Sequence, residues 1–273
     1  MGRRIINRHP ARGSALVLGV LPFLALAVLY VTFSSLRLAE NPDDKLLPAL
    51  SSIGDAIHRM AFEPDQRSGR YLLWADTAAS LTRLAWGLGI ATLMALVTGI
   101  AVGLVPYVRA WLAPLIGVIS LVPPMAILPI LFIVFGLDDL SKVVLIVIGI
   151  APFLIRDMSM RVMEMPNELL IKAQALGAST WQIVVRIILP QMLPRLIDSV
   201  RLSLGPAWLF LIAAEGIAAT EGLGYRIFLV RRYLAMDVIL PYVAWITLIA
   251  FLMDWGLRRL SRRIFPWISR GMA

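Results

Sequence analysis

A succession of long apolar runs is the feature that most constrains what this chain can fold into. A helix needs about 20 predominantly apolar residues to cross the hydrocarbon core of a bilayer, which is about 30 Å thick. Six runs approach or exceed that length: residues 14–36, 77–105, 111–135, 140–155, 196–218 and 238–257. Lipid cannot satisfy exposed backbone polar groups, so such runs are typical of membrane-spanning helices. We therefore predict an all-α integral membrane protein with about six transmembrane helices.

Composition and charge agree with a membrane protein. Hydrophobic residues make up 59% of the chain and the mean hydropathy is +0.82, whereas a soluble domain contains about 45–50% apolar residues. The net charge of +9 could suggest a nucleic-acid partner. However, the arginines flank apolar runs and do not form one basic face, so we expect no nucleic acid. Their excess on one side of the spans predicts that both termini are cytoplasmic.

The N-terminal part differs from the rest of the chain. Its apolar run is longer than a signal-peptide core and is followed by no small-residue cleavage pattern, so we expect a retained first span. Residues 46–62 have near-helical apolar spacing, which predicts a short amphipathic helix on the outer surface. We accordingly divide the chain into residues 1–76, with the first span and an extracytoplasmic amphipathic segment, and residues 77–273, the transmembrane core.

A polar interruption from Met165 to Pro194 separates the fourth and fifth runs. Its pattern predicts an amphipathic helix, a turn at Gly177, and a second short helix that Pro190 and Pro194 end. A segment of this kind must lie in water or against a partner protein. Its position therefore indicates a docking element, here placed in the cytoplasm between spans four and five.

The spacing within this loop resembles the coupling-loop signature of bacterial ABC importer permeases. Gly177 is followed after nine residues by Ile187, and after one more by Leu189 and Pro190. The usual Glu-Ala-Ala triplet is replaced by Ile171, Lys172 and Ala173, of which only Ala173 matches; Glu168, one turn earlier, is an alternative to the missing glutamate. The resemblance implies that an ATPase subunit docks on Glu168, Lys172, Ala173, Gly177, Ala178, Ser179, Ile187, Leu189 and Pro190.

The string SLTRLAWGLG resembles the opening of the transporter core in the same permease family, and two further strings resemble its nitrate, sulfonate and taurine branch: LVPPMAILPI and AWLFLIAAEGIAATEGLGY. The resemblance implies a bacterial inner-membrane permease that moves nitrate, a sulfonate, taurine or a guanidinium-like solute by alternating access. It also implies a second permease copy, ABC ATPase subunits that bind ATP and Mg²⁺, an extracytoplasmic solute-binding protein, and contact with membrane lipid. The alternative is an integral-membrane enzyme or a structural membrane subunit.

Five residues are candidates for the solute pathway or its gate. Pro123, Pro124 and Pro129 interrupt the third run, and such kinks either line a watery cavity or serve packing alone. Asp157 follows the fourth run and Glu215 lies within the fifth. An ionisable residue in a membrane run is a functional candidate, especially for a cationic solute. The alternatives are an interfacial position for Asp157 and a packing role for Glu215.

Several kinds of chemistry lack the residues that they need. The chain has no cysteine, and its two histidines are far apart in sequence, so we expect no metal site. It contains no phosphate-binding Gly-x-x-x-x-Gly-Lys-Ser/Thr stretch and no Gly-x-Ser-x-Gly elbow. We therefore expect no catalytic residues and no bound cofactor, with ATP and Mg²⁺ held by a partner subunit.

Overall fold

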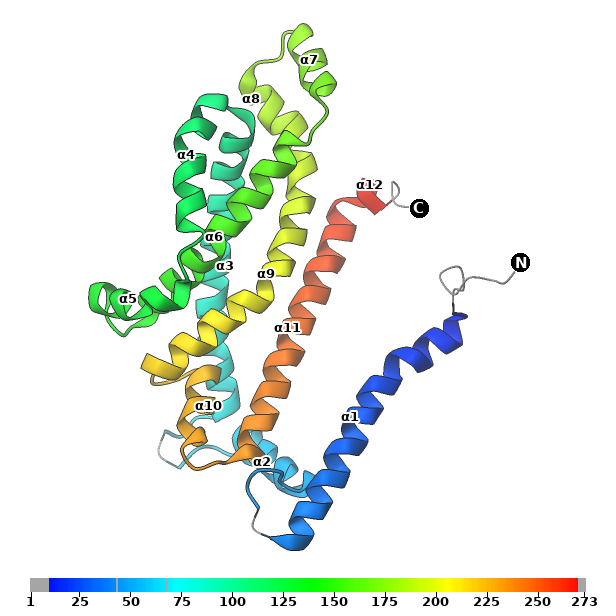
Figure 1. Cartoon of the computed structure of the whole chain (residues 1–273), viewed down its shortest axis with the longest axis vertical. Coiled ribbons are helices and arrows are strands. Elements are labelled where there is room, and N and C mark those ends of the chain that lie inside the picture. Colours follow the sequence, from blue (N-terminus) through cyan, green and yellow to red (C-terminus); the bar gives the residue numbers. More distant parts are fainter. Residues whose placement is uncertain (1–9, 43, 67, 270–273) are drawn as a thin grey trace.

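The computed structural model describes residues 10–42, 44–66 and 68–269, and all regular structure in these ranges is helical. This confirms the predicted all-α fold (Figure 1). The elements are α1 (Arg12–Glu40), α2 (Leu50–Phe62), α3 (Leu72–Leu104), α4 (Pro106–Ile119), the 3₁₀ helix η2 (Pro124–Ile127), α5 (Leu128–Phe135), α6 (Asp139–Met163), α7 (Asn167–Ala175), α8 (Thr180–Ile183), the π-helix η3 (Val184–Ile188), α9 (Leu189–Ala218), α10 (Leu223–Arg231), α11 (Met236–Ile264) and α12 (Pro266–Ser269).

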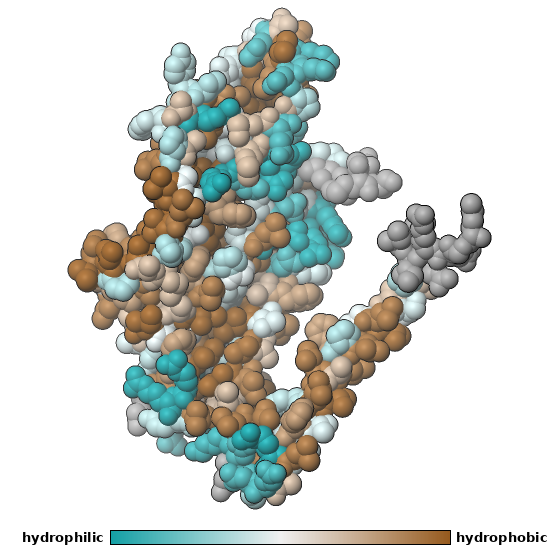
Figure 2. Space-filling view, in the orientation of Figure 1, coloured by the Kyte–Doolittle hydropathy of each residue, from teal (hydrophilic) through white to brown (hydrophobic). Residues whose placement is uncertain are grey.

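The helices run between two ends of the molecule (Figure 1). We call the end that bears α7 and α8 the α7 end, and the end that bears α2 and α10 the α10 end. Figure 2 shows hydrophobic residues over much of the middle of the visible face and along α1, with hydrophilic residues at the bottom, at the top and down the right side of the upper half. This distribution fits a protein whose middle lies in a bilayer and whose two ends lie in water.

In the described part of the chain, five helices are long and apolar enough to cross a membrane, and a bent pair brings the number to as many as six. The pair consists of α4 and the segment Pro124–Phe135, which meet at an angle of 79°. The predicted third span, residues 111–135, is therefore not one helix. The helix breaks at Pro123 and Pro124. Proline lacks an N–H donor and disfavours helical backbone in the residue before it.

Helix α1 leaves the bundle, and none of its most apolar 18-residue window is buried (Figure 1). Hydrogen bonds attach it to the segment before α2. Tyr30 Oη donates to the Pro48 carbonyl at 2.8 Å, Ser34 Oγ donates to the carbonyls of Leu47 at 3.0 Å and Pro48 at 3.1 Å, and Arg37 Nε donates to Asp44 Oδ2. Such an apolar helix is stable only in lipid or against another protein surface. The predicted amphipathic helix is present as α2, although it begins at Leu50 and not at residue 46.

Helices α3 and α6 pack against each other over much of their length, and glycines on α3 allow the two backbones to approach closely. A Cβ atom at Gly87 would lie 2.6 Å from Ile146 Cγ2, and one at Gly99 would lie 2.7 Å from Met158 Cβ. In contrast, a Cβ atom at Gly89 would meet nothing within 4 Å. Small residues that let two backbones approach are common at helix contacts in membranes.

We expect Gly87→Ala to destabilise the protein, because the added methyl would push against Ile146 in a packed contact. Overpacking of this kind costs about 1–3 kcal/mol. Gly89→Ala, on the same helix but facing open space, is the matched control and is expected to be neutral or slightly stabilising. Unfolding midpoints of the two variants in detergent micelles would compare them, and equal midpoints would refute the assigned contact.

Candidate functional site

The loop between α6 and α9 folds as a helix, a glycine turn and a second helix, as predicted. Gly177 has φ +80°, in the left-handed region. Its N–H donates to the Gln174 carbonyl at 2.9 Å, and the N–H of Ala178 donates to the Ala173 carbonyl at 3.0 Å. These two bonds form a Schellman motif, which closes a helix on a left-handed residue. A Cβ atom at position 177 would meet nothing within 4 Å, so glycine is needed there for its backbone conformation alone.

The second helix of the loop starts at a capping box. The Gln182 N–H donates to Ser179 Oγ at 3.3 Å, and the Ser179 N–H donates to Gln182 Oε1 at 2.8 Å. This reciprocal pair satisfies backbone donors that a helix start otherwise leaves free. The turn at Gly177 is thus held from both sides, by the end of α7 and by the start of α8.

The prediction that Pro190 and Pro194 end the second helix is wrong. The chain is helical from Thr180 to Ala218, through α8, η3 and α9. In η3 the backbone bonds widen, and the Leu189 N–H donates to the Val184 carbonyl, so the ladder shifts before Pro190 enters the first turn of α9. The fifth span, predicted to start at residue 196, is therefore continuous with the loop helix.

The predicted docking residues differ in exposure. Glu168, Lys172, Gly177 and Ser179 are exposed, whereas Ala178, Ile187, Leu189 and Pro190 are half-buried and Ala173 is buried. Three large apolar side chains that were not among the predicted docking residues are more exposed than most: Leu176 at 87%, Trp181 at 73% and Ile171 at 61%. Apolar residues in a polar loop were the signal for them. Together they give the α7 end an apolar surface beside Glu168 and Lys172.

The candidate pathway residues on α4 to α6 separate into two places. Pro123, Pro124 and Pro129 lie at the break and in the first turn of α5, which projects sideways from the bundle (Figure 1). Asp157 lies near the α7 end, where it accepts a hydrogen bond from Arg161 Nε at 2.8 Å and another from Ser199 Oγ of α9. It therefore connects α6 to α9.

Glu215 is completely buried, and its carboxylate has several donors. Arg83 Nη1 donates to Oε1 at 2.7 Å, Ser80 Oγ donates to the same oxygen at 2.8 Å, and the Gly224 N–H donates to Oε2 at 2.9 Å. Arg83 in turn donates through Nε to Asp139 Oδ1 at 2.6 Å. A carboxylate engaged in this way has little capacity left for a passing cation, which favours the packing interpretation of Glu215 over the pathway interpretation.

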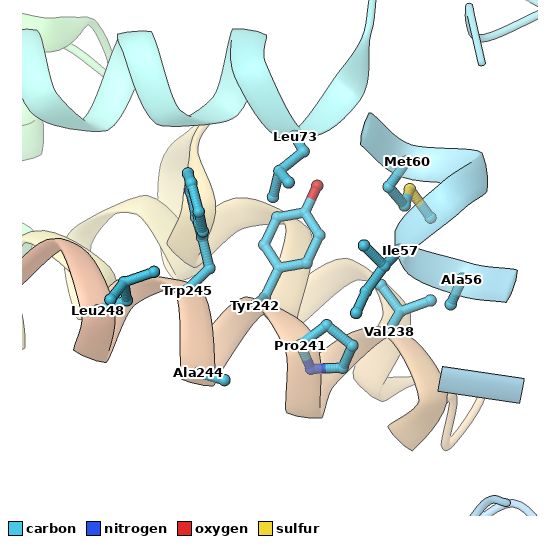
Figure 3. Close-up of a pocket in the computed structure, with 10 residues that line it drawn as sticks. All are labelled: Ala56, Ile57, Met60, Leu73, Val238, Pro241, Tyr242, Ala244, Trp245 and Leu248. Carbon is cyan, nitrogen blue, oxygen red and sulfur yellow. The ribbon is translucent and has the colours of Figure 1, made fainter. Parts of the chain in front are cut away.

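A second buried carboxylate, Asp76, holds α10 against α3. Arg226 Nε donates to Asp76 Oδ2 at 2.8 Å, the Gly222 N–H donates to Oδ1 at 3.0 Å, and Tyr242 Oη donates to Oδ2 at 3.1 Å. Figure 3 shows the Tyr242 ring on α11 beside Leu73, with its hydroxyl directed toward the α3 ribbon. We call the set Asp76, Ser80, Arg83, Glu215 and Arg226 the α10 clasp.

Sequence reasoning found only Glu215 among the clasp residues. Asp76, Ser80 and Arg83 recur at intervals of four and three residues, so they share one face of α3. That polar stripe in an apolar run was the available signal.

Position 222 requires glycine, because its φ is +128° and a Cβ atom would lie 2.6 Å from Glu215 Cδ. Within residues 10–42, 44–66 and 68–269 no three His, Asp or Glu residues are placed to hold a metal ion.

Comparison with known proteins gives consistent results. The family described as "Binding-protein-dependent transport system inner membrane component" matches residues 87–266. The taurine transport system permease protein of Escherichia coli (strain K12) is 43% identical over 195 residues, 71% of each chain. The bicarbonate transport system permease protein of Synechococcus elongatus is 31% identical over 204 residues, 74% of this chain and 71% of the relative.

The fold also has a solved counterpart. A crystal structure of a bacterial alginate ABC transporter, in complex with a periplasmic protein bound to an alginate pentasaccharide, contains a chain that superposes with a TM-score of 0.61. The superposition covers 93% of this chain and 99% of the other, at 14% identity. At that identity the likeness shows a shared fold.

Proposed function

This chain belongs to the family of inner membrane components of binding-protein-dependent transport systems, and from that premise we propose that it is the permease subunit of an ATP-driven importer of a small sulfonate such as taurine. The observation that carries the choice of solute is the 43% identity to the taurine permease. Nitrate and guanidinium-like solutes, which the sequence also allowed, have no such support. A membrane enzyme or a structural subunit is not favoured, since the relatives are permeases.

The proposed transporter contains two copies of this chain, ABC ATPase subunits that hold ATP and Mg²⁺, and an extracytoplasmic solute-binding protein. The solved alginate transporter, which was crystallised with a periplasmic protein, supports the last of these. This chain itself would hold no cofactor. In the proposed domain division, residues 1–76 add a peripheral span and an extracytoplasmic helix to a core of residues 77–273, and the family match lies within that core.

The α7 end supplies the proposed ATPase contact. Glu168, Lys172, Leu176 and Trp181 are exposed there, and the second loop helix continues directly into α9. Movement of the docked loop would therefore tilt α9 as one piece, which is a physical route to alternating access. Coupling of this kind requires that ATP and solute each favour one of two states of the same element.

We propose that the α7 end and both termini lie in the cytoplasm of the bacterial cell. This proposal rests on the excess of arginines in the segments that it places on the cytoplasmic side of the membrane. Alkaline phosphatase and green fluorescent protein fused after Ala273 or inserted at Gly69 would test the orientation. The fusion after Ala273 is expected to fluoresce without phosphatase activity, and the insertion at Gly69 is expected to show the reverse. Phosphatase activity after Ala273 would contradict the assignment.

Uptake of labelled taurine tests the function directly. The permease would be reconstituted in proteoliposomes with its ATPase and solute-binding protein, and ATP would be supplied on the side of the α7 end. We expect uptake that requires ATP and the binding protein, and competition by other small sulfonates. Empty liposomes and ADP are the controls. A complex that hydrolyses ATP but moves neither taurine nor another sulfonate would contradict the proposed solute.

A further inference from the structure

A cavity of about 480 Å³ opens at the α10 end, between the turn before α6 and the turn after α9. Its charged lining residues are Arg83, Asp138, Asp139, Lys142 and Glu221. Arg83 is 4% exposed and Lys142 is 1% exposed, so the two cations form the floor. Asp138, on the rim, is exposed. The Asp139 side chain is 65% exposed and that of Glu221 is 44% exposed, so these two are on the rim as well.

The floor retains unused hydrogen-bond donors. Lys142 Nζ donates to the carbonyls of Leu137 at 2.7 Å and Asp138 at 3.0 Å, which engages two of its three N–H bonds. Among the described residues no carboxylate lies within ion-pair distance of this ammonium group. Arg83 uses Nε and Nη1 for Asp139, Glu215 and the Glu221 carbonyl, and its Nη2 has no acceptor in the described part of the chain. A buried cation without a carboxylate partner is stabilised by an anionic ligand.

The rim has the opposite character. No hydrogen bond or ion pair within the described ranges engages the Asp138 carboxylate, whereas Asp139 faces Arg83 and Glu221 faces Arg70. A ligand that carries only negative charge would be repelled by this unpaired carboxylate on its way to the floor. A ligand that carries only positive charge would be repelled by Lys142 at the floor. A ligand with an anionic head and a nearby ammonium group satisfies both layers, and the unpaired charges act against ligands of a single sign.

We propose that this cavity is the first solute site of the permease and that it selects zwitterions, with the sulfonate of an amino-sulfonate on Lys142 and Arg83 and its ammonium group on Asp138. The inference rests on the proposed function, under which the α10 end faces the side from which the solute arrives. It adds to the proposed function an account of how the solute is recognised: the negative group of the solute binds at the floor of the cavity, and its positive group binds at the rim.

The test measures equilibrium binding of labelled taurine to the full-length permease in nanodiscs, without the binding protein. Lys142→Met removes the floor charge and is expected to weaken taurine binding at least about tenfold, as loss of a charge-assisted hydrogen bond does. Asp138→Asn removes the rim charge. It is expected to weaken taurine and to strengthen competition by ethanesulfonate, which lacks the ammonium group. Lys45→Met and Asp55→Asn remove the same charges from exposed positions and are expected to bind as wild type does.

Either of two variant results would overturn the inference: wild-type affinity in Lys142→Met, or an unchanged preference for taurine over ethanesulfonate in Asp138→Asn. Asp138 is exposed, so its variant is expected to fold and keeps the test decisive if Lys142→Met does not. Absence of taurine binding to the wild-type permease would also overturn the inference. ATP-driven taurine uptake by the complete transporter would in that case leave the proposed function intact, so the two failures are distinguishable.

Discussion

Gly177→Val is expected to reduce ATP-driven uptake at least about tenfold while the permease still inserts and folds. The Schellman motif places residue 177 at φ +80°, a conformation that is costly for a residue with a Cβ and most costly for a β-branched one. The strain would release the turn and shift α8 relative to α7. Because α8 continues into α9, the proposed ATPase contact would lose its rigid link to the span.

A graded series isolates the backbone effect. Gly177→Asn is expected to retain much of the activity, because asparagine tolerates the left-handed region better than other residues with a side chain. Gly256→Ala, a helical position with nothing within 4 Å, is the control for an added methyl and is expected to behave as wild type. The measurements are taurine uptake and its ratio to ATP hydrolysis in proteoliposomes. Wild-type coupling in Gly177→Val would contradict the role assigned to the turn.

Arg83→Met is expected to destabilise the protein by about 3–5 kcal/mol, the usual result of leaving one member of a buried ion pair alone. Glu215 has no exposed surface, so without the guanidinium 2.7 Å away its carboxyl group would be buried with no partner of opposite charge. The turn before α10 would also lose the hydrogen bond that Arg83 Nη1 on α3 donates to the Glu221 carbonyl. Denaturant-induced unfolding in mixed micelles measures the free energy of unfolding.

The double variant Arg83→Met with Glu215→Gln is expected to recover part of that loss, because the glutamine leaves no buried charge and can still accept from the Gly224 N–H. Arg258→Met, which removes a partly exposed partner of Asp254 while Arg201 remains, is the matched control, and its expected cost is about 0–1 kcal/mol. Glu215→Gln alone is expected to impair transport regardless of solute charge. A defect confined to cationic solutes would instead support Glu215 as a pathway residue.

Local pattern was sufficient for several of the spans and for the glycine turn of the loop between α6 and α9. The hydrophobic cost of placing polar groups in lipid acts on each run separately, so the runs at 14–36, 77–105 and 238–257 could be located without knowledge of their neighbours. The turn at Gly177 could also be predicted from the sequence, because a Schellman motif depends on only a few consecutive residues. Family membership followed from the spacing between Gly177 and Pro190, which the comparisons confirmed.

Tertiary structure decided what depends on distant partners. Proline has opposite effects at two places in the chain. The helix bends by 79° at Pro123 and Pro124, whereas it continues through Pro190. The difference lies in the surrounding backbone hydrogen bonds, which shift to a π-helical pattern just before Pro190. The partner of Glu215 is Arg83, 132 residues away in the chain. Pairing of buried charges is set by which helix faces meet, so the clasp and the cavity beside it could be seen only once α3, α6 and α9 were packed together.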